Sequence, residues 1–283
     1  MKVVTTREDL RAARTGLDDL GFVPTMGYLH DGHLGLVRRA RRECAGVAAS
    51  IFVNPTQFGP GEDLTSYPRD LDRDLSLLED SGVDLVWTPR VEDVYPSGFA
   101  TNVQITGVTE VLEGARRPGH FGGVATVVTI LLALMRPRQL FVGQKDLQQS
   151  VVLRRLVADL GLAEEVVVCP TGRESDGLAM SSRNIYLDDA HRQAARVLST
   201  ALRAARAAYA SGQRDAATLR GTMEAILAAE PLADVDYVSL ADPDTLVELE
   251  GPITRAAASL AVRVGRPRLI DNTLLHEDDP GLG

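Results

Sequence analysis

The chain has little of several features that mark particular classes of protein. Its two cysteines, Cys44 and Cys169, form neither a disulfide framework nor a metal-binding spacing, and they fit reduced thiols in a cytoplasmic protein. The net charge of −9 argues against a nucleic acid or an anionic membrane as the main partner, because both require a basic surface. The longest apolar stretch, residues 122–135, is too short to span a bilayer and predicts a buried helix. The first residues also lack the apolar core of a signal peptide.

Lysine is equally scarce. The 30 cationic side chains include only two lysines, Lys2 and Lys145, and all the others are arginines. Arginine presents a fixed planar fork, whereas lysine presents a compact point charge. Position 145 therefore either requires an ammonium group or retains a lysine by chance. The residues around it in the sequence distinguish between these two interpretations.

Short apolar runs alternate with helix-period segments through the first 170 residues. This alternation predicts βαβ units, a parallel sheet covered by helices, and strand-to-helix turns that share one edge of the sheet. After residue 171 an Ala/Arg-rich pattern and short alternating runs predict a smaller α+β domain with antiparallel strands. We therefore expect domains at 1–171 and 172–283. The expected strands are 21–25, 46–53, 83–87, 138–143 and 165–169, then 234–240, 245–249 and 259–264; the expected helices are 33–44, 68–81, 122–135, 146–160, 188–212 and 215–229.

The first strand-to-helix turn contains two of the chain's five histidines, His30 and His33, with Gly32 between them. A helix N-terminus favours an anion, because its free N–H groups and its dipole both attract negative charge. The glycine lets a ligand approach the backbone closely. The alternative interpretation is two solvated histidines in a polar loop, and metal binding is disfavoured because no third ligand lies nearby. The H-x-G-H spacing favours a phosphate site.

Two further segments carry polar side chains at predicted turns. Asn54 and Gln57 follow the second strand on a Pro-stiffened turn, where neutral amides suit a small ligand with hydroxyl or carboxylate groups, although Asn is also an ordinary turn residue. Before the buried helix, residues 116–120 place two arginines and His120 in a loop. The sequence favours neither a ligand-binding loop nor an ordinary solvated loop at this position.

Two later turns complete the predicted set. Gly143, Lys145, Asp146 and Gln149 lie between a strand and a helix, so Lys145 shares the sheet edge with the histidine turn, where a mobile ammonium can follow charge during phosphoryl transfer. At the domain junction, a loop combines Met180 with hydroxyl and guanidinium donors that can close over phosphates. Those donors are Arg173, Ser181, Ser182 and Arg183.

The motifs, taken in order, resemble the pantothenate synthetase (pantoate–β-alanine ligase) family of the HxGH nucleotidyltransferase superfamily. They are "PTMGYLHDGH", "FVNPTQF", "YPRDLDRD", "RPGHFGGVATVV", "GQKDLQQ" and "DGLAMSSRN", with "RLIDN" near the end. The resemblance implies a Rossmann-like N-terminal domain and a C-terminal lid domain. It also implies a homodimer that uses ATP, Mg²⁺, pantoate and β-alanine, and makes pantothenate through a pantoyl adenylate, releasing pyrophosphate and AMP.

The resemblance also implies roles for individual residues. It makes four residues catalytic: His30, His33, Lys145 and Arg183. It assigns pantoate to Gln57 and Gln149, with Asn54 beside them, and a magnesium-associated position to Asp74. The implied ATP site consists of Met26, Gly32, Gly143, Lys145, Asp146, Gly172, Met180, Ser181, Ser182 and Arg183.

The chain departs from the family pattern at two of these places. Gly172 stands where an apolar residue often lies beside the adenine, and Arg73 stands before Asp74 where some relatives carry a second acid. Two other functions compete with the ligase. A nucleotidyltransferase that adenylylates a phosphate-bearing substrate would need cations where Gln57 and Gln149 stand, and a non-catalytic nucleotide-binding module would have no use for Lys145 beside two histidines.

Overall fold

The computed structural model describes residues 1–276, and the chain divides into two compact units. The first contains Met1–Gln144 and Gln148–Pro170, and the second contains Lys145–Leu147 and the chain from Thr171 onward. The domain boundary expected between residues 171 and 172 stays a prediction. Among residues 1–276, no helix combines the length and apolarity needed to cross a bilayer.

The first unit is built on a six-stranded parallel sheet, which confirms the predicted α/β class. The strand order is β1-β4-β3-β2-β5-β6, so the chain moves outward from β2 to β4 and then returns to the other side of β2 for β5. The prediction missed β1, which is only three residues long. The strands are β1 (Lys2–Val4), β2 (Leu20–Thr25), β3 (Gly46–Ile51), β4 (Leu85–Trp87), β5 (Gln139–Gly143) and β6 (Glu165–Cys169).

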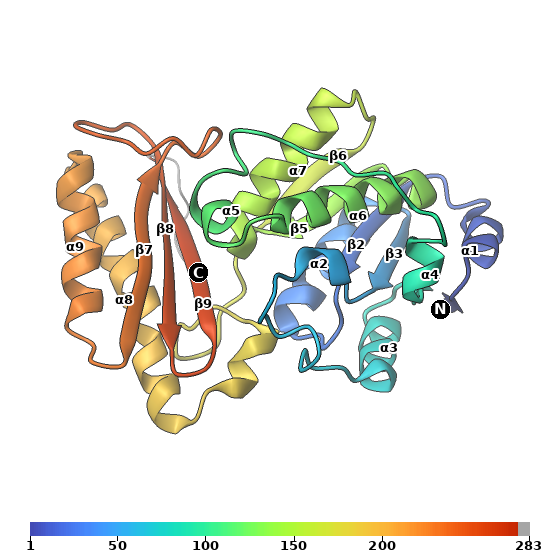
Figure 1. Ribbon diagram of the computed structural model, residues 1–283, viewed down its shortest axis with the longest axis horizontal. Helices are drawn as coiled ribbons and strands as arrows, with labels where there is room; N and C mark the ends of the chain where they lie inside the picture. Colours follow the sequence, from blue (N-terminus) through green and yellow to red (C-terminus); the bar gives the residue numbers. More distant parts are fainter. Residues whose placement is uncertain (277–283) are drawn as a thin grey trace. The chain divides into compact units, whose positions relative to one another are not determined.

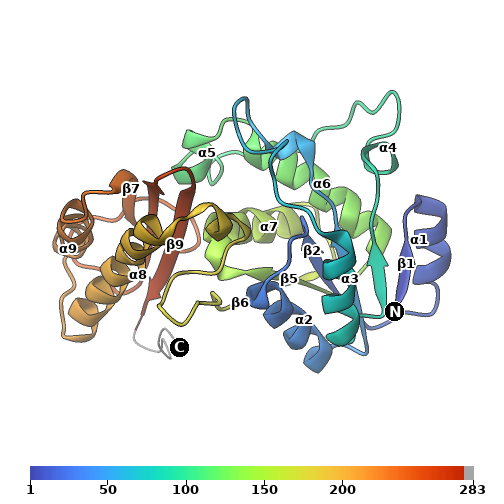
Figure 2. The ribbon, with the colours of Figure 1, turned by 90° about the horizontal axis from the view of Figure 1, so that it is seen from below.

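Helices cover both faces of this sheet (Figure 1). Successive residues of a strand point to opposite faces, so Phe22 packs toward α1, α6 and α7, whereas Val23 packs toward α2 and α3. In Figures 1 and 2, α6 and α7 lie on one side of the strands and α2 and α3 on the other. The helices are α1 (Arg7–Arg14), α2 (Asp31–Glu43), α3 (Leu71–Asp80), α4 (Val91–Val94), α5 (Leu112–Arg116), α6 (His120–Met135) and α7 (Leu147–Asp159).

Helix α6 is the buried helix that the apolar run predicts. Eleven of its residues are buried, and it is apolar on most of its circumference. At Gly123 it lies so close to the turn after β3 that an added Cβ atom would lie 2.3 Å from the Thr56 carbonyl oxygen. Only glycine permits this spacing, so the beginning of α6 and that turn form one packed layer.

The second unit is a three-stranded antiparallel sheet of order β7-β8-β9 with two long helices packed on it, which confirms the predicted α+β arrangement. The expected strand at 245–249 is wrong. Leu246 adopts a left-handed conformation (φ 60°), and Asp242 accepts hydrogen bonds from the N–H groups of Asp244 and Thr245, so this segment is a turn. The elements are η3 (Ser182–Tyr186), α8 (Asp189–Ala210), α9 (Ala216–Ala228), β7 (Ala233–Ala241), β8 (Ala256–Val264) and β9 (Arg268–Leu275).

Candidate active site

The sheet opens at the carboxyl ends of β2 and β5. β2 pairs with β3 along its whole length, from Leu20 to Thr25, but it pairs with β5 only at Gly21 and Phe22. The reversal of strand order also falls between β2 and β5. Open α/β sheets bind ligands beyond the carboxyl ends of the strands at such a reversal. The histidine turn follows β2 and the Lys145 turn follows β5, so the two predicted phosphate-binding turns begin at this position.

The histidine turn connects β2 to α2 with His30 as the N-cap residue and His33 in the first helical turn. The His30 N–H lies 3.3 Å from Nδ1 of His33, and the ring centroids are 4.0 Å apart with planes tilted by 33°. Gly32 lies between them at the second helical position. The structure thus brings the two histidines and Gly32 together at a helix N-terminus, where an anion is favoured.

Asp74, which lies in the first turn of helix α3, contacts the segment that leads from β2 to the two histidines. Its side chain is only 1% exposed, and its two oxygens accept hydrogen bonds from the N–H groups of Tyr28 (2.6 Å) and Leu29 (2.7 Å). Burial raises the pKa of the Asp74 carboxyl, while the hydrogen bonds from Leu29 and Tyr28 act in the opposite direction. The magnesium-associated role stays a prediction, and residues 1–276 contain no cluster of three or more His, Cys, Asp or Glu that could hold a metal ion.

The turn after β3 forms the short helix η1 (Pro55–Gln57) and brings three predicted residues together. Asn54 is buried and donates to Oε1 of Gln57 (3.1 Å) and to the Gly123 carbonyl oxygen (3.3 Å). The Gln57 amide nitrogen lies 3.2 Å from the Met26 sulfur. The hydroxyl of Tyr95 donates to the Asn54 amide oxygen (2.7 Å). Asn54 therefore supports the turn that presents Gln57, and Tyr95 is a supporting residue that the sequence analysis missed.

The loop before α6 also supports this turn. Nδ1 of His120 lies 2.8 Å from the Gln57 carbonyl oxygen, so it donates, and Nε2 accepts from Arg117 (3.1 Å). Arg117 in turn binds both oxygens of Glu62 (2.8 and 2.7 Å). From the sequence, His120 and Arg117 could be either ligand-binding or ordinary loop residues. In the structure they hold the backbone of the predicted pantoate turn, His120 directly and Arg117 through His120. Burial, aided by the nearby Arg117 charge, lowers the pKa of His120 below its ordinary value of 6.5.

This histidine predicts a pH-dependent contribution to stability. A histidine whose pKa is lower in the folded than in the unfolded state binds fewer protons when folded, so its contribution is present above pH 6.5 and is lost as the pH falls. Wild-type protein should therefore lose more unfolding free energy on acidification than His120→Gln, by up to about 1.4 kcal/mol per pH unit below 6.5. Urea unfolding of both proteins between pH 7.5 and 5 measures the difference. Parallel losses in the two proteins would show that His120 does not contribute in this way.

The turn after β5 carries the other phosphate-binding candidates. Gly143 ends the strand, the short helix η2 (Gln144–Asp146) follows, and α7 begins at Leu147. The Lys145 ammonium lies 3.9 Å from Oδ1 of Asp146, and its backbone carbonyl accepts from the Asn272 amide (2.8 Å). Asn272 belongs to the "RLIDN" segment, which the sequence analysis noted without assigning a role.

Gln149 lies half-buried in the first turn of α7, next to a glutamine with a different role. Gln148 is buried, and its amide holds the backbone of the preceding loop by donating to the carbonyl oxygens of Val108 (2.9 Å) and Val111 (2.8 Å). Adjacent residues on a helix point about 100° apart. The side chain of Gln149 therefore points away from the loop contacts that Gln148 makes with Val108 and Val111.

The loop after β6 lies in the second unit and is only partly as expected. The Met180 N–H donates to the Gly172 carbonyl (2.9 Å), and Ser181 caps η3 by accepting from the Arg183 N–H (3.3 Å), with Ser182 as the first residue of η3. The expectation that Arg173 serves as a phosphate donor is wrong, because its guanidinium is buried in an ion pair with Asp271 (2.7 and 3.0 Å). The remaining loop residues stay predicted ligands.

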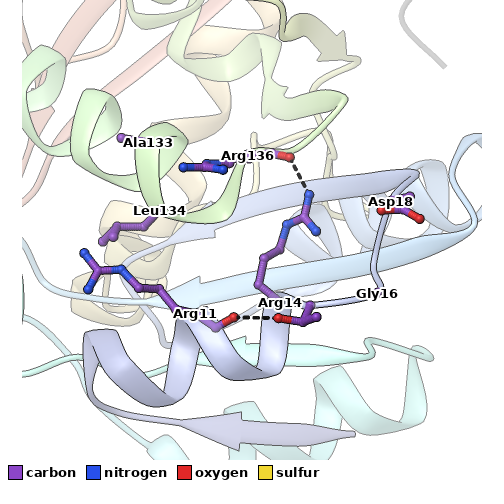
Figure 3. A pocket seen from close by; sticks show the side chains of 8 residues that line it. Arg11, Arg14, Gly16, Asp18, Ala133, Leu134 and Arg136 are labelled. Atoms are coloured by element: carbon purple, nitrogen blue, oxygen red, sulfur yellow. Dashed lines mark hydrogen bonds between the residues drawn. The ribbon is translucent and has the colours of Figure 1, made fainter.

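The first unit also contains a surface pocket of about 590 Å³ (Figure 3). It is formed where α1 and α6 end, at the amino edge of the sheet, and three arginines line it: Arg11, Arg14 and Arg136. The Arg14 guanidinium donates to the Arg136 carbonyl oxygen (2.9 Å) just beyond the end of α6. Two helix C-termini favour cations, so these charges stabilise helix ends. None of the predicted site residues lines this pocket.

Comparison with known proteins gives concordant matches. The sequence model of the family described as pantoate-beta-alanine ligase matches residues 2–274. The pantothenate synthetase of Herpetosiphon aurantiacus is 58% identical over 97% of this chain and 100% of its own length, and that of Chloroflexus aurantiacus is 59% identical over 97% and 98%. The crystal structure of pantothenate synthetase from Thermus thermophilus superposes with a TM-score of 0.94 at 51% identity, covering 96% of this chain and 99% of that one. A Francisella tularensis pantoate-beta-alanine ligase, crystallised with beta-gamma ATP and beta-alanine, superposes with a TM-score of 0.79 at 33% identity and 97% coverage of both chains.

Proposed function

We infer the reaction of this chain from one premise, that it belongs to the pantoate–β-alanine ligase family. We propose that it joins pantoate and β-alanine in two steps. In the first, a pantoate carboxylate oxygen attacks the α-phosphorus of ATP, the bond to the β-phosphate oxygen breaks, and pyrophosphate leaves. In the second, the β-alanine amine attacks the acyl carbon of pantoyl adenylate. The bond to AMP then breaks, the nitrogen loses a proton, and pantothenate forms.

The observation that carries this proposal is the pair of imidazoles at the start of α2. Their rings are 4.0 Å apart at a helix N-terminus, and α2 follows β2 at the edge where β2 and β5 separate. Adenylation moves charge toward the leaving pyrophosphate, and fixed donors aimed at that charge lower the barrier. We propose that His30, His33, Lys145 and Arg183 supply these donors. The ATP is bound by Met26, Gly32, Gly143, Asp146, Gly172, Met180, Ser181 and Ser182.

The proposed pantoate site uses neutral groups. Gln57 is held by Asn54 through its side chain and by His120 through its carbonyl oxygen, so its amide is presented from a fixed turn. With Gln149 it would bind the hydroxyl and carboxylate oxygens of pantoate. A substrate carrying its own phosphate would require cations at these positions, which argues against the nucleotidyltransferase alternative.

Further proposals concern the setting of the reaction. Mg²⁺ would enter with the ATP phosphates, since the Asp74 carboxylate is only 1% exposed and is held by two backbone hydrogen bonds. Water would hydrolyse the adenylate, so residues 172–283 would act as a lid. We propose a homodimer by resemblance to the family, and a cytoplasmic location that suits the free, buried Cys44 and Cys169.

The proposal is tested by separating the two half-reactions. Purified protein with ATP, Mg²⁺ and pantoate should release pyrophosphate, and AMP and pantothenate should appear only after β-alanine is added. ATP binding without pyrophosphate release would instead indicate a nucleotide-binding module or a different acid acceptor.

Replacing Gln149 with alanine should separate the two substrates. We expect the KM for pantoate to rise about 10- to 100-fold, because a hydrogen bond to a carboxylate is lost, while the KM for ATP stays within about two-fold. Steady-state pyrophosphate release at varied pantoate and ATP measures both constants. Gln148→Ala is the matched control: it removes the neighbouring amide that holds the loop at Val108 and Val111, and should lower thermal stability instead. Equal changes in both KM values for Gln149→Ala would place pantoate elsewhere.

A further inference from the structure

Helix α3 contacts the backbone of the histidine turn, the segment between β2 and α2, through two consecutive residues, Arg73 and Asp74. We propose that Asp74 is a positioning residue for His30 and His33, and that it acts through the backbone of the turn and not as a ligand of Mg²⁺. This inference rests on the proposed function, because it concerns how the phosphate-binding histidines of that reaction are placed.

The backbone of the turn is shaped to receive a carboxylate. Gly27 (φ 83°) and Tyr28 (φ 51°) are both left-handed. Successive N–H groups in such a turn can form a concavity that binds an anion. Here the anion is Asp74, with Oδ2 at 2.6 Å from the Tyr28 nitrogen and Oδ1 at 2.7 Å from the Leu29 nitrogen. Each oxygen therefore has its own donor, and both contacts are short, as expected for charged acceptors.

The conformation of the turn requires such support. Tyr28 is a non-glycine residue in the left-handed region, which a Cβ atom makes unfavourable. At Gly27 an added Cβ atom would lie 3.0 Å from Oδ2 of Asp74 and 3.0 Å from the Ile51 side chain, so the turn lies tightly against both. The carboxylate offsets the unfavourable backbone at the two residues that set the direction of the chain after β2.

Arg73 completes the contact by binding the other backbone group of Leu29, its carbonyl oxygen. Its Nη1 atom donates to the Leu29 carbonyl oxygen (2.9 Å), and its guanidinium carbon lies 5.6 Å from the centre of the Tyr28 ring. Both polar groups of Leu29 are thus bound by α3, and its side chain is 1% exposed in the core. The next residue is His30, the N-cap of α2, so α3 determines where the imidazoles begin.

The same contacts argue against direct metal coordination. Each oxygen of Asp74 already accepts a backbone N–H, and the side chain is only 1% exposed, so almost none of the carboxylate surface is open to a divalent cation. The guanidinium of Arg73 also lies 3.7 Å from Oδ1, which repels a cation.

The test compares Asp74→Asn with Asp72→Asn, which removes an exposed carboxylate from the same helical turn. Asparagine keeps one acceptor but directs an NH₂ group at the second backbone N–H. We expect pyrophosphate release from pantoate to fall about 10- to 100-fold at every Mg²⁺ concentration, because misplaced catalytic groups lose rate. The Mg²⁺ concentration for half-maximal rate and the KM for pantoate should stay within about two-fold of wild type. Asp72→Asn should match wild type throughout.

Two results would overturn the proposal: an unchanged rate, or a rate that excess Mg²⁺ restores with a shifted half-maximal concentration, which would make Asp74 a metal ligand.

An independent measurement does not depend on activity. The amide proton signals of Tyr28 and Leu29 in ¹⁵N-labelled protein should move upfield in Asp74→Asn and not in Asp72→Asn, and unmoved signals would exclude the two hydrogen bonds. If Asp74→Asn does not fold, Asp74→Glu replaces it in both measurements, because it keeps the charge but moves the carboxylate away from the two N–H groups; an unchanged rate would overturn the proposal. If wild-type protein releases no pyrophosphate from pantoate, the proposed function fails, while the amide signals still test the backbone contact.

Discussion

His33→Gln should reduce pyrophosphate release from pantoate about 100- to 1,000-fold, the loss typical for removing a donor to developing charge. The substitution is chosen to preserve the fold. His33 is the third residue of α2, and its Nδ1 atom accepts from the N-cap N–H of His30 (3.3 Å). Glutamine at this position can accept the same hydrogen bond in a capping box. A fall in rate would then report the missing imidazole and not a frayed helix.

The chain contains a matched control for this experiment. His191 is also the third residue of a helix, α8, and its N–H donates to the N-cap residue Asp188 (2.9 Å). His191→Gln changes the same residue type at the same helical position without touching a predicted ligand. We expect it to keep wild-type activity, with both variants unfolding near the wild-type temperature. A His33→Gln rate close to wild type would remove His33 from the proposed mechanism.

Lys145→Arg should be almost as damaging, with a loss of about 100-fold or more, although it preserves the positive charge. The Lys145 side chain is 20% exposed, and its backbone is fixed through the carbonyl that accepts from Asn272. A longer, planar guanidinium cannot pivot on that fixed backbone to follow charge between phosphate oxygens. The same measurement of pyrophosphate release applies, together with equilibrium binding of ATP, which should change less than the rate.

Lys2→Arg is the control, because it changes the chain's other lysine, which lies exposed in β1. It should behave as wild type. If Lys145→Arg is also fully active, position 145 requires only a positive charge, and the scarcity of lysine in the chain loses its significance for the site.

The fold was largely predictable because its main elements carry strong local signals. The buried runs that become β2, β3 and β5, and the uncharged, mainly apolar stretch of α6, are long enough to be assigned from the local sequence alone. β1 was missed because three residues carry too little pattern, and it becomes a strand only by pairing with β4. The segment at 245–249 alternates like a strand, but the left-handed Leu246 and the hydrogen bonds to Asp242 turn the chain. Nothing in the alternation itself reveals that turn.

The candidate site was predictable where the chemistry is local and not where it depends on distant partners. The H-x-G-H spacing sets the two imidazoles together because helical geometry does so directly. The role of Asn54 depends on Gly123 and Tyr95, and the burial of Arg173 depends on Asp271, ninety-eight residues along the chain. Each of these partners is defined only by tertiary packing. A glutamate and a histidine joined by Arg117, as found at the Gln57 turn, likewise have no signature in sequence spacing.

The close approach of Gly123 to Thr56 has a consequence for reading mutational tolerance. Any other amino acid at position 123 places a carbon against the Thr56 carbonyl oxygen and displaces the segment that ends in Gln57. A survey of single substitutions scored by growth without pantothenate would therefore rank position 123 with the histidines, although a glycine has no side chain to offer a substrate. Intolerance at position 123 would reflect the close approach of two backbone segments and not a contact with substrate. Mutational sensitivity at this position is therefore not evidence for a catalytic role.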